Sequence, residues 1–203
     1  MIGCSTSWEP FFSILRTDYM DGLSAYIKTS EIKAPAMDDI FRPMYDIAPE
    51  KIRVVWLGQD PYPGSGHACG RAFALSATYV GKTPMSLANI LRLCERTTGS
   101  VTRDLTLQSW VDQGVFLVNA FPTLSPNASK MWEPFTGALL HYISYKYPSV
   151  VFVMLGKVAQ SFIPYIAPNS KVVSAPHPAS RDGSFQKSAL FNELSSIVPE
   201  IKF

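Results

Sequence analysis

The segment that decides the fold runs Arg53-Val54-Val55-Trp56-Leu57-Gly58-Gln59-Asp60-Pro61-Tyr62-Pro63. Its first half is a short apolar run rich in β-branched residues, which is typical of a strand buried on both faces. The run stops at Gly58, and Asp60 follows in a turn made of prolines and glycines. Ligands bind beyond the carboxyl ends of parallel strands, so Asp60 is either a functional carboxylate or only a turn former before proline.

The composition indicates a globular protein with a single domain over residues 1–203. The chain has 203 residues, of which 47% are hydrophobic and 12% aromatic, enough to bury a proper core. No repeat, low-complexity tract or charge block marks an internal boundary. The net charge of +2 permits a nucleic-acid partner but does not argue for one.

The cysteines and the apolar runs exclude several classes of protein. Cys4, Cys69 and Cys94 are odd in number and form no C-x-x-C pair, which predicts an intracellular protein without a disulfide framework, zinc site or iron–sulfur cluster. No apolar run approaches the ~20 residues of a membrane span, and the N-terminus does not resemble a signal peptide. We therefore expect no membrane partner.

Three further apolar runs predict buried strands, over 115–118, 150–155 and 171–175. Residues 29–50 are expected to be a connection that Phe41 and Tyr45 anchor to the core, and residues 73–75 a short extended piece. Helices are predicted over 8–28, 106–113, 132–147, 158–166 and 186–197, and from Pro84 onward with Thr83 as N-cap. This alternation predicts a three-layer α/β/α sandwich around a central four-stranded, mainly parallel sheet.

Polar residues follow the four predicted strands at equivalent places. Asp60 comes after the first strand, Asn119 after the second, Gly156 and Lys157 after the third, and His177 after the fourth. Taken singly, Asn119 reads as a loop amide and His177 as a satisfied polar residue. Because parallel strands end along one rim, a carboxylate, an amide and an imidazole are expected to converge in one crevice, which favours a site.

A second pattern imitates a nucleotide-binding loop. Gly81-Lys82-Thr83 matches the end of a P-loop, but the required first glycine falls on Ser76 and Pro84 follows at once. We therefore do not expect nucleotide binding there.

Six motifs follow one another over about residues 40 to 195: Gly58-Gln59-Asp60-Pro61-Tyr62, Gly70-Arg71-Ala72-Phe73, Thr83-Pro84-Met85-Ser86-Leu87, Leu117-Val118-Asn119-Ala120, Leu155-Gly156-Lys157-Val158-Ala159-Gln160 and Ala175-Pro176-His177-Pro178. In this order they resemble the water-activating loop, the uracil-stacking segment, the proline-rich DNA-backbone loop, the uracil-reading strand end, the glycine-containing segment and the minor-groove loop of family-1 uracil-DNA glycosylases. Each motif is moderately specific, and the ordered set is highly specific.

The resemblance implies a hydrolase that removes uracil from DNA by base flipping in base-excision repair, without a metal or cofactor. It implies that Asp60 stabilises the sugar cation and orients water, and that His177 donates a hydrogen bond to uracil O2. Phe73 would stack on the base, Asn119 would read its edge, and Tyr62 would exclude the methyl of thymine. Gln59 also belongs to the implied substrate site. The implied DNA contacts are Lys82, Pro84, Ser86, Gly156, Lys157, Pro178, Ser180 and Arg181.

Two motifs resemble the poxvirus branch, in which the glycosylase also serves as a polymerase processivity subunit. They are Asp-Pro-Tyr-Pro at 60–63, where many relatives have histidine instead of Pro63, and His-Pro-Ala-Ser-Arg-Asp at 177–182. The alternative function is therefore a DNA-binding replication subunit with weak excision activity. A hydrolase of small nucleosides is a third reading, but the loops that contact DNA would then have no use.

Arg181 stands where relatives usually carry the leucine that fills the gap left by the flipped nucleotide. Its guanidinium is suited to stacking on a base, and its charge suits the minor groove. Phe185 is a rival wedge, although it also fits the core face of the last helix. We favour Arg181.

The expected partner is uracil-containing DNA, single- or double-stranded. A proteinaceous glycosylase inhibitor and a polymerase processivity factor are further candidate partners. We expect a monomer in the compartment that holds the DNA: the cytoplasm of a bacterium, a cytoplasmic virus factory, or the host nucleus for a nuclear virus.

Overall fold

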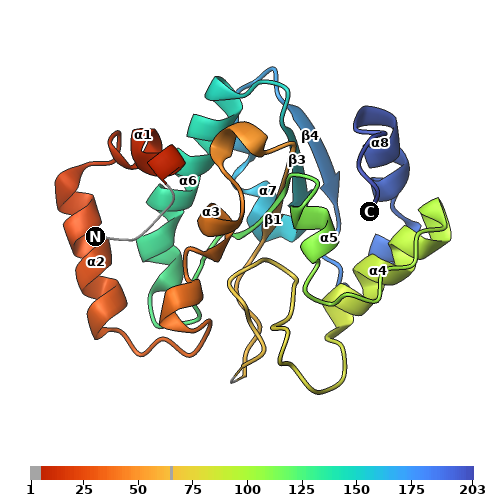
Figure 1. Cartoon of the computed structure of the whole chain (residues 1–203), viewed down its shortest axis with the longest axis horizontal. Coiled ribbons are helices and arrows are strands. Elements are labelled where there is room, and N and C mark those ends of the chain that lie inside the picture. The colour runs from red at the N-terminus through yellow and green to blue at the C-terminus, as the bar shows by residue number, and fades with distance from the viewer. Residues whose placement is uncertain (1–5, 65) are drawn as a thin grey trace.

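A computed structural model describes residues 6–64 and 66–203 of the chain (Figure 1). Its centre is one sheet in which all neighbouring strands are parallel, in the order β2-β1-β3-β4. Each of the four strands lies where the sequence predicts it. They are β1 Val54–Gly58, β2 Val115–Asn119, β3 Val151–Leu155 and β4 Lys171–Ala175.

The register of the sheet aligns the ends of its strands. Val54 pairs with Val115 on one side and with Val151 on the other, and Gly58 pairs with Asn119. Strands β1, β2 and β3 are buried along their whole length, whereas the edge strand β4 is partly exposed. The predicted convergence of residues beyond these strands therefore follows directly from the register.

Helices cover both faces of the sheet, which confirms the three-layer α/β/α prediction. In Figure 1, α1, α2 and α6 lie on one side of the strands, and α4, α5 and α8 lie on the other. The helices are α1 Glu9–Phe12, α2 Thr17–Thr29, α3 Arg42–Asp46, α4 Met85–Thr98, α5 Gln108–Val111, α6 Ala128–Lys146, α7 Gly156–Gln160 and α8 Leu190–Ile197. Short 3-10 turns occur at Thr6–Trp8, Met37–Asp39, Pro49–Lys51, Ile163–Tyr165 and Phe185–Lys187.

The single helix predicted over 8–28 is wrong, because the chain breaks between α1 and α2. Arg16 has extended backbone angles (φ −63°, ψ 135°), and the carboxylate of Asp18 accepts hydrogen bonds from the Arg16 guanidinium and from the Tyr19 amide. Trp8 and Leu23 are nevertheless both fully buried. The apolar periodicity therefore marks the buried residues correctly but does not reveal the change in backbone direction.

The connection over 29–50 carries more structure than predicted, including α3. Phe41 is buried as expected, but Tyr45 is 45% exposed and does not anchor the segment in the core. Helix α4 begins at Met85 and has Pro84 at its N-cap, so Thr83 is not the cap. Residues 73–75 form no strand; an isolated bridge joins Ala68 to Leu75.

In the described part of the chain, no helix is both long enough and apolar enough to cross a membrane.

Candidate active site

The ends of β1 and β2 form the floor of the site. The Ala120 amide donates to the Gly58 carbonyl, and the Phe121 amide donates to the Gln59 carbonyl, each at 2.9 Å. A Cβ atom on Gly58 would lie 2.6 Å from Oδ1 of Asn119 and 2.9 Å from Cβ of Ala72. Glycine is therefore needed at the end of β1, because any side chain would occupy the space that Asn119 uses.

The carboxamide of Asn119 has no protein partner. The residue is 3% exposed, and no group in residues 6–64 or 66–203 hydrogen-bonds to its side-chain amide. The amide atoms are not among the fully enclosed, unpartnered polar atoms of the described residues, so they remain accessible and can bind a ligand. Asn119 offers an acceptor and a donor side by side, so it suits a ligand edge with the complementary pair.

Phe73 stands beside Asn119 in an unusual backbone conformation. Its φ is 63°, in the left-handed region that bulky side chains rarely adopt. Its ring lies 6.3 Å from the His177 ring, and its Cε2 would be 3.3 Å from a Cβ on Gly58. Strained residues of this kind cluster at ligand sites, so Phe73 is a candidate to present its ring to a flat ligand.

The Tyr62 hydroxyl ties together the segments around Phe73. It donates to the Phe73 carbonyl at 2.9 Å and shares a hydrogen bond with Ser86 Oγ at 2.9 Å. Burial raises the pKa of Tyr62 to about 12, so the phenol stays protonated. Ser86 is mostly buried and its hydroxyl is engaged by Tyr62, and its contact with DNA stays a prediction.

His177 is arranged as a neutral hydrogen-bond donor. Its Nδ1 accepts from the Ala179 amide at 3.1 Å, so the proton of the neutral ring is on Nε2. Burial lowers the pKa of His177, while the charge of Asp60 acts in the opposite direction. The neutral ring is therefore favoured, with Nε2–H free to donate.

Asp60 stands at the exposed mouth of the site. Partial burial raises the pKa of its carboxyl, opposed by the Gln59 side chain, whose Nε2 lies 3.4 Å from Oδ2, and by His177. Gln59 and Asp60 directly follow Gly58, whose Cα faces Asn119 and Phe73, and the Phe73 ring lies 6.3 Å from the His177 ring. The structure thus brings together Gln59, Asp60, Tyr62, Phe73, Asn119 and His177, as the sequence predicts.

The loop after β4 is held from two sides. A Cβ on Gly156 (φ +84°) would lie 2.8 Å from Cβ of His177, so this glycine lets the loop approach α7. The Pro178 carbonyl accepts from Nδ2 of Asn89 on α4 at 2.7 Å, and Gln160 on α7 donates to the Ala175 carbonyl at 3.0 Å. The sequence analysis assigned no role to Asn89, since only the tertiary structure brings it to this loop.

A groove of about 660 Å³ lies next to His177, between α7 and the loop after β4. Lys157 is exposed there, and Ser180 also contributes to the lining. Lys82 and Pro84 belong to another loop, before α4, and only Lys82 is fully exposed. The contacts of these residues with DNA stay predictions. The groove is lined by Gln59, Leu155, Gly156, Lys157, Val158, Gln160, Ser174, Ala175, Pro176, His177, Ser180, Asp182 and Ser184.

Arg181 and Phe185 have opposite environments. Phe185 is 1% exposed and belongs to the hydrophobic core, so the alternative that it swings out as a wedge is contradicted. Arg181 is exposed. The carboxylate of Asp182 accepts from the amide and the hydroxyl of Ser184, and the described residues include no ion pair between Arg181 and Asp182.

No group of three or more histidine, cysteine, aspartate or glutamate side chains that could hold a metal ion occurs among the described residues.

Comparison with known proteins places this site in a family. The model of the uracil DNA glycosylase superfamily matches residues 45–195, which include every element of the site. The chain belongs to the uracil-DNA glycosylase superfamily. This membership confirms the resemblance drawn from the ordered motifs, and it is the family of DNA repair hydrolases that act on N-glycosyl bonds.

Curated relatives and solved structures agree with this assignment. A uracil-DNA glycosylase from Chlamydia felis is 35% identical over 70% of this chain, and the match spans 65% of that relative's own length. One from Clostridium beijerinckii is 31% identical over 85% of this chain and 80% of its own length. A variant of mimivirus UNG in complex with UGI has a TM-score of 0.85 at 26% identity, covering 98% of this chain and 86% of its own. The mimivirus uracil-DNA glycosylase has a TM-score of 0.82 at 25% identity, covering 96% of this chain and 83% of its own.

Proposed function

We propose that this chain hydrolyses the N-glycosidic bond of deoxyuridine in DNA and leaves an abasic site. The observation that carries the proposal is the Asn119 carboxamide, without a protein partner, beside the Phe73 ring, with Asp60 beyond the end of β1 and His177 beyond the end of β4. A base inside the DNA stack is out of reach, so the nucleotide must first be flipped toward these residues.

Base selection follows from the chemistry of three side chains. Asn119 pairs its acceptor with N3–H of uracil and its donor with O4, whereas cytosine presents the opposite pattern. Phe73 stacks on the ring. Tyr62 stands against C5 and leaves no room for the methyl of thymine, and its hydrogen bonds to the Phe73 carbonyl and Ser86 keep it from moving aside.

The chemical step separates a positive sugar from a negative base. Asp60 opposes the charge of the oxocarbenium-like sugar and orients the attacking water. His177 donates from Nε2–H to uracil O2 as negative charge reaches that oxygen. A neutral donor is suited to this task because it binds the developing anion more strongly than the neutral base, and its tautomer is fixed by the Ala179 amide.

The DNA strand is proposed to follow the loops around this pocket. Lys82, Lys157 and Ser180, with nearby backbone amides, serve as phosphate contacts, and Gly156, Pro84 and Pro178 shape the loops. Arg181 enters the gap left by the flipped nucleotide. The mimivirus UNG complex with UGI supports a further proposal, that a proteinaceous inhibitor of this kind binds the same DNA face. The site of action is the compartment that holds the DNA.

A strand-nicking assay tests the proposal. An oligonucleotide with one uracil is incubated with the protein and then treated with alkali, in single- and double-stranded form. The control is the same sequence with thymine, and a second control is the Asp60→Asn variant. Alkali-sensitive cleavage at uracil alone supports the proposal. Binding of the oligonucleotide without an abasic product would favour the replication-subunit alternative.

A further inference from the structure

The stacking residue Phe73 lies in a segment that has few backbone hydrogen bonds of its own. Residues 70–74 belong to no helix or strand. The Ala72 amide donates to the Leu117 carbonyl at 3.2 Å, and the Phe73 carbonyl accepts from Tyr62. The left-handed conformation of Phe73 is unfavourable for a side chain with a Cβ, so neighbouring contacts must maintain it.

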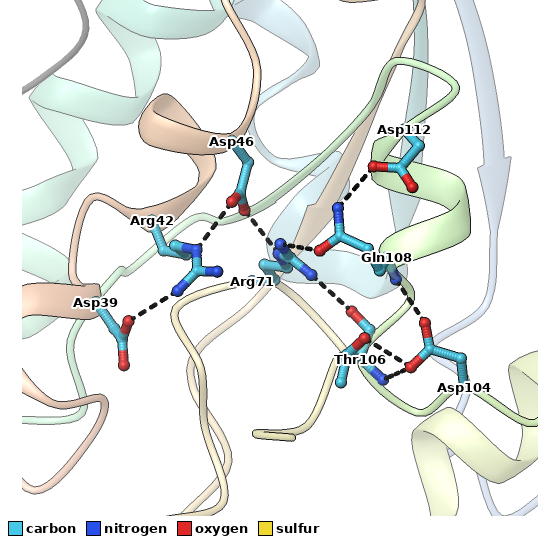
Figure 2. Close-up of polar contacts among 8 residues, drawn as sticks. All are labelled: Asp39, Arg42, Asp46, Arg71, Asp104, Thr106, Gln108 and Asp112. Carbon is cyan, nitrogen blue, oxygen red and sulfur yellow. Dashed lines mark hydrogen bonds and ion pairs between the residues drawn. The ribbon is translucent and has the colours of Figure 1, made fainter. Parts of the chain in front are cut away.

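Arg71 provides three such contacts, two residues before Phe73 (Figure 2). Its side chain is 4% exposed. Nε donates to Asp46 Oδ2 at 2.6 Å, Nη1 to the Thr106 carbonyl at 3.0 Å, and Nη2 to Gln108 Oε1 at 2.7 Å. One guanidinium therefore joins the stacking segment to α3, to α5 and to the loop before α5.

Each acceptor of Arg71 is itself held in place. Asp46 also accepts from Nε of Arg42 at 2.8 Å, and Gln108 donates to Asp112 at 2.7 Å (Figure 2). Asp104 accepts from the Thr106 amide and hydroxyl and from the Gln108 amide at 3.0 Å or less. The planar guanidinium of Arg71 thus binds acceptors that are themselves fixed, so these hydrogen bonds both stabilise the side chain and define its position.

The chain on both sides of Arg71 fits this anchorage. Gly70 (φ +84°) packs so closely on the 3-10 turn Met37–Asp39 that a Cβ would lie 1.9 Å from the Asp39 carbonyl oxygen. After Phe73, the Leu75 amide donates to the Leu105 carbonyl at 2.9 Å. Residues 70–75 are therefore held by contacts before and after Phe73, and the Arg71 side chain joins this segment to α3 and α5.

We propose that Arg71 is a positioning residue for base stacking: its buried guanidinium holds Phe73 at the depth and angle at which the ring covers the flipped uracil. This inference rests on the proposed function of the site. Arg71 does not touch the base, so its contribution to binding uracil passes through Phe73.

A matched pair of variants separates positioning from general stability. Arg71→Met removes the guanidinium from the stacking segment. Arg42→Met removes a guanidinium that binds the same Asp46 carboxylate but lies on α3 and is 43% exposed. Affinity for free uracil is measured by NMR titration, and affinity for an oligonucleotide with a tetrahydrofuran abasic analogue is measured separately, because that DNA has no base to stack. Thermal unfolding is followed for each variant.

Arg71→Met is expected to weaken free-uracil binding about tenfold, which lies within the loss expected when a base no longer stacks on an aromatic ring, with binding of the abasic analogue unchanged. Arg42→Met should change neither affinity. In the Phe73→Ala background, Arg71→Met should cause no further loss of uracil affinity, because two residues that act through one contact are not additive. Single-turnover excision should fall in parallel with uracil affinity.

The inference is overturned if Arg71→Met lowers only the unfolding temperature, or if its effect adds in full to that of Phe73→Ala. Where Arg71→Met does not fold, Arg71→Lys decides, because lysine keeps the charge near Asp46 but cannot reproduce the three-way fork. Wild-type uracil affinity in Arg71→Lys would overturn the inference, and a loss of about threefold would support it. If the wild-type protein makes no abasic product, only the proposed function fails. The role of Arg71 is still tested, because uracil binding is measured without catalysis.

Discussion

Replacing Gly58 with alanine tests whether the end of β1 must stay empty for the base-reading site to form. The new Cβ would lie 2.6 Å from Asn119 Oδ1, 2.9 Å from Ala72 Cβ and 3.3 Å from Phe73 Cε2, whereas ordinary contacts begin at 3.4 Å. Subtracting 2.6 from 3.4 leaves 0.8 Å by which the Asn119 oxygen must move. Misplacement by about 1 Å can cost about 100-fold in rate, or roughly 2.7 kcal/mol.

We therefore expect Gly58→Ala to slow single-turnover excision by about two orders of magnitude, with an overpacking cost of about 1–3 kcal/mol in the free energy of unfolding. The matched control is Gly22→Ala on α2, where a Cβ would meet nothing within 4 Å. That variant should excise at the wild-type rate and gain roughly 0.5–1 kcal/mol in stability, because alanine favours a helix. The assay uses a single-stranded uracil oligonucleotide well below the unfolding temperature. A folded Gly58→Ala protein with wild-type excision would refute the reasoning.

Three further predictions concern the remaining parts of the site. Burial raises the pKa of Asp60, so its carboxylate becomes protonated, and the single-turnover rate should fall, at a pH above the pKa of an ordinary aspartate. Asp60→Asn should be slow and should show no such fall in rate at acid pH. Tyr62→Ala should admit thymine and Asn119→Asp should admit cytosine, each measured on the matching oligonucleotide; if neither base is excised while uracil activity falls, the base-reading roles are wrong. Arg181→Ala should impair excision from duplex DNA at least about tenfold more than excision from single strands, because only a duplex has a gap to fill. Equal losses on the two substrates would mean that Arg181 is a general electrostatic contact.

The sheet and the convergence of the polar residues could be read from the sequence, because both depend on local patterns. A run such as Val54–Leu57 is short, apolar and rich in β-branched residues, so it favours a strand buried on both faces. Once four such runs are parallel, their carboxyl ends share an edge. Asp60, Asn119 and His177 then meet without any knowledge of side-chain packing.

The conformation of the site depends on contacts between segments far apart in the chain, and local sequence patterns do not predict those contacts. The apolar period over 8–28 continues across a break in the helix because the buried face is kept while the backbone turns at Arg16. Phe185 matched both a wedge and a core residue until its burial in the tertiary structure decided the matter. Arg71 looked like any polar residue in a loop. Only the folded chain gives it acceptors on α3 and α5, because Asp46 and Gln108 lie 25 and 37 positions away in the sequence.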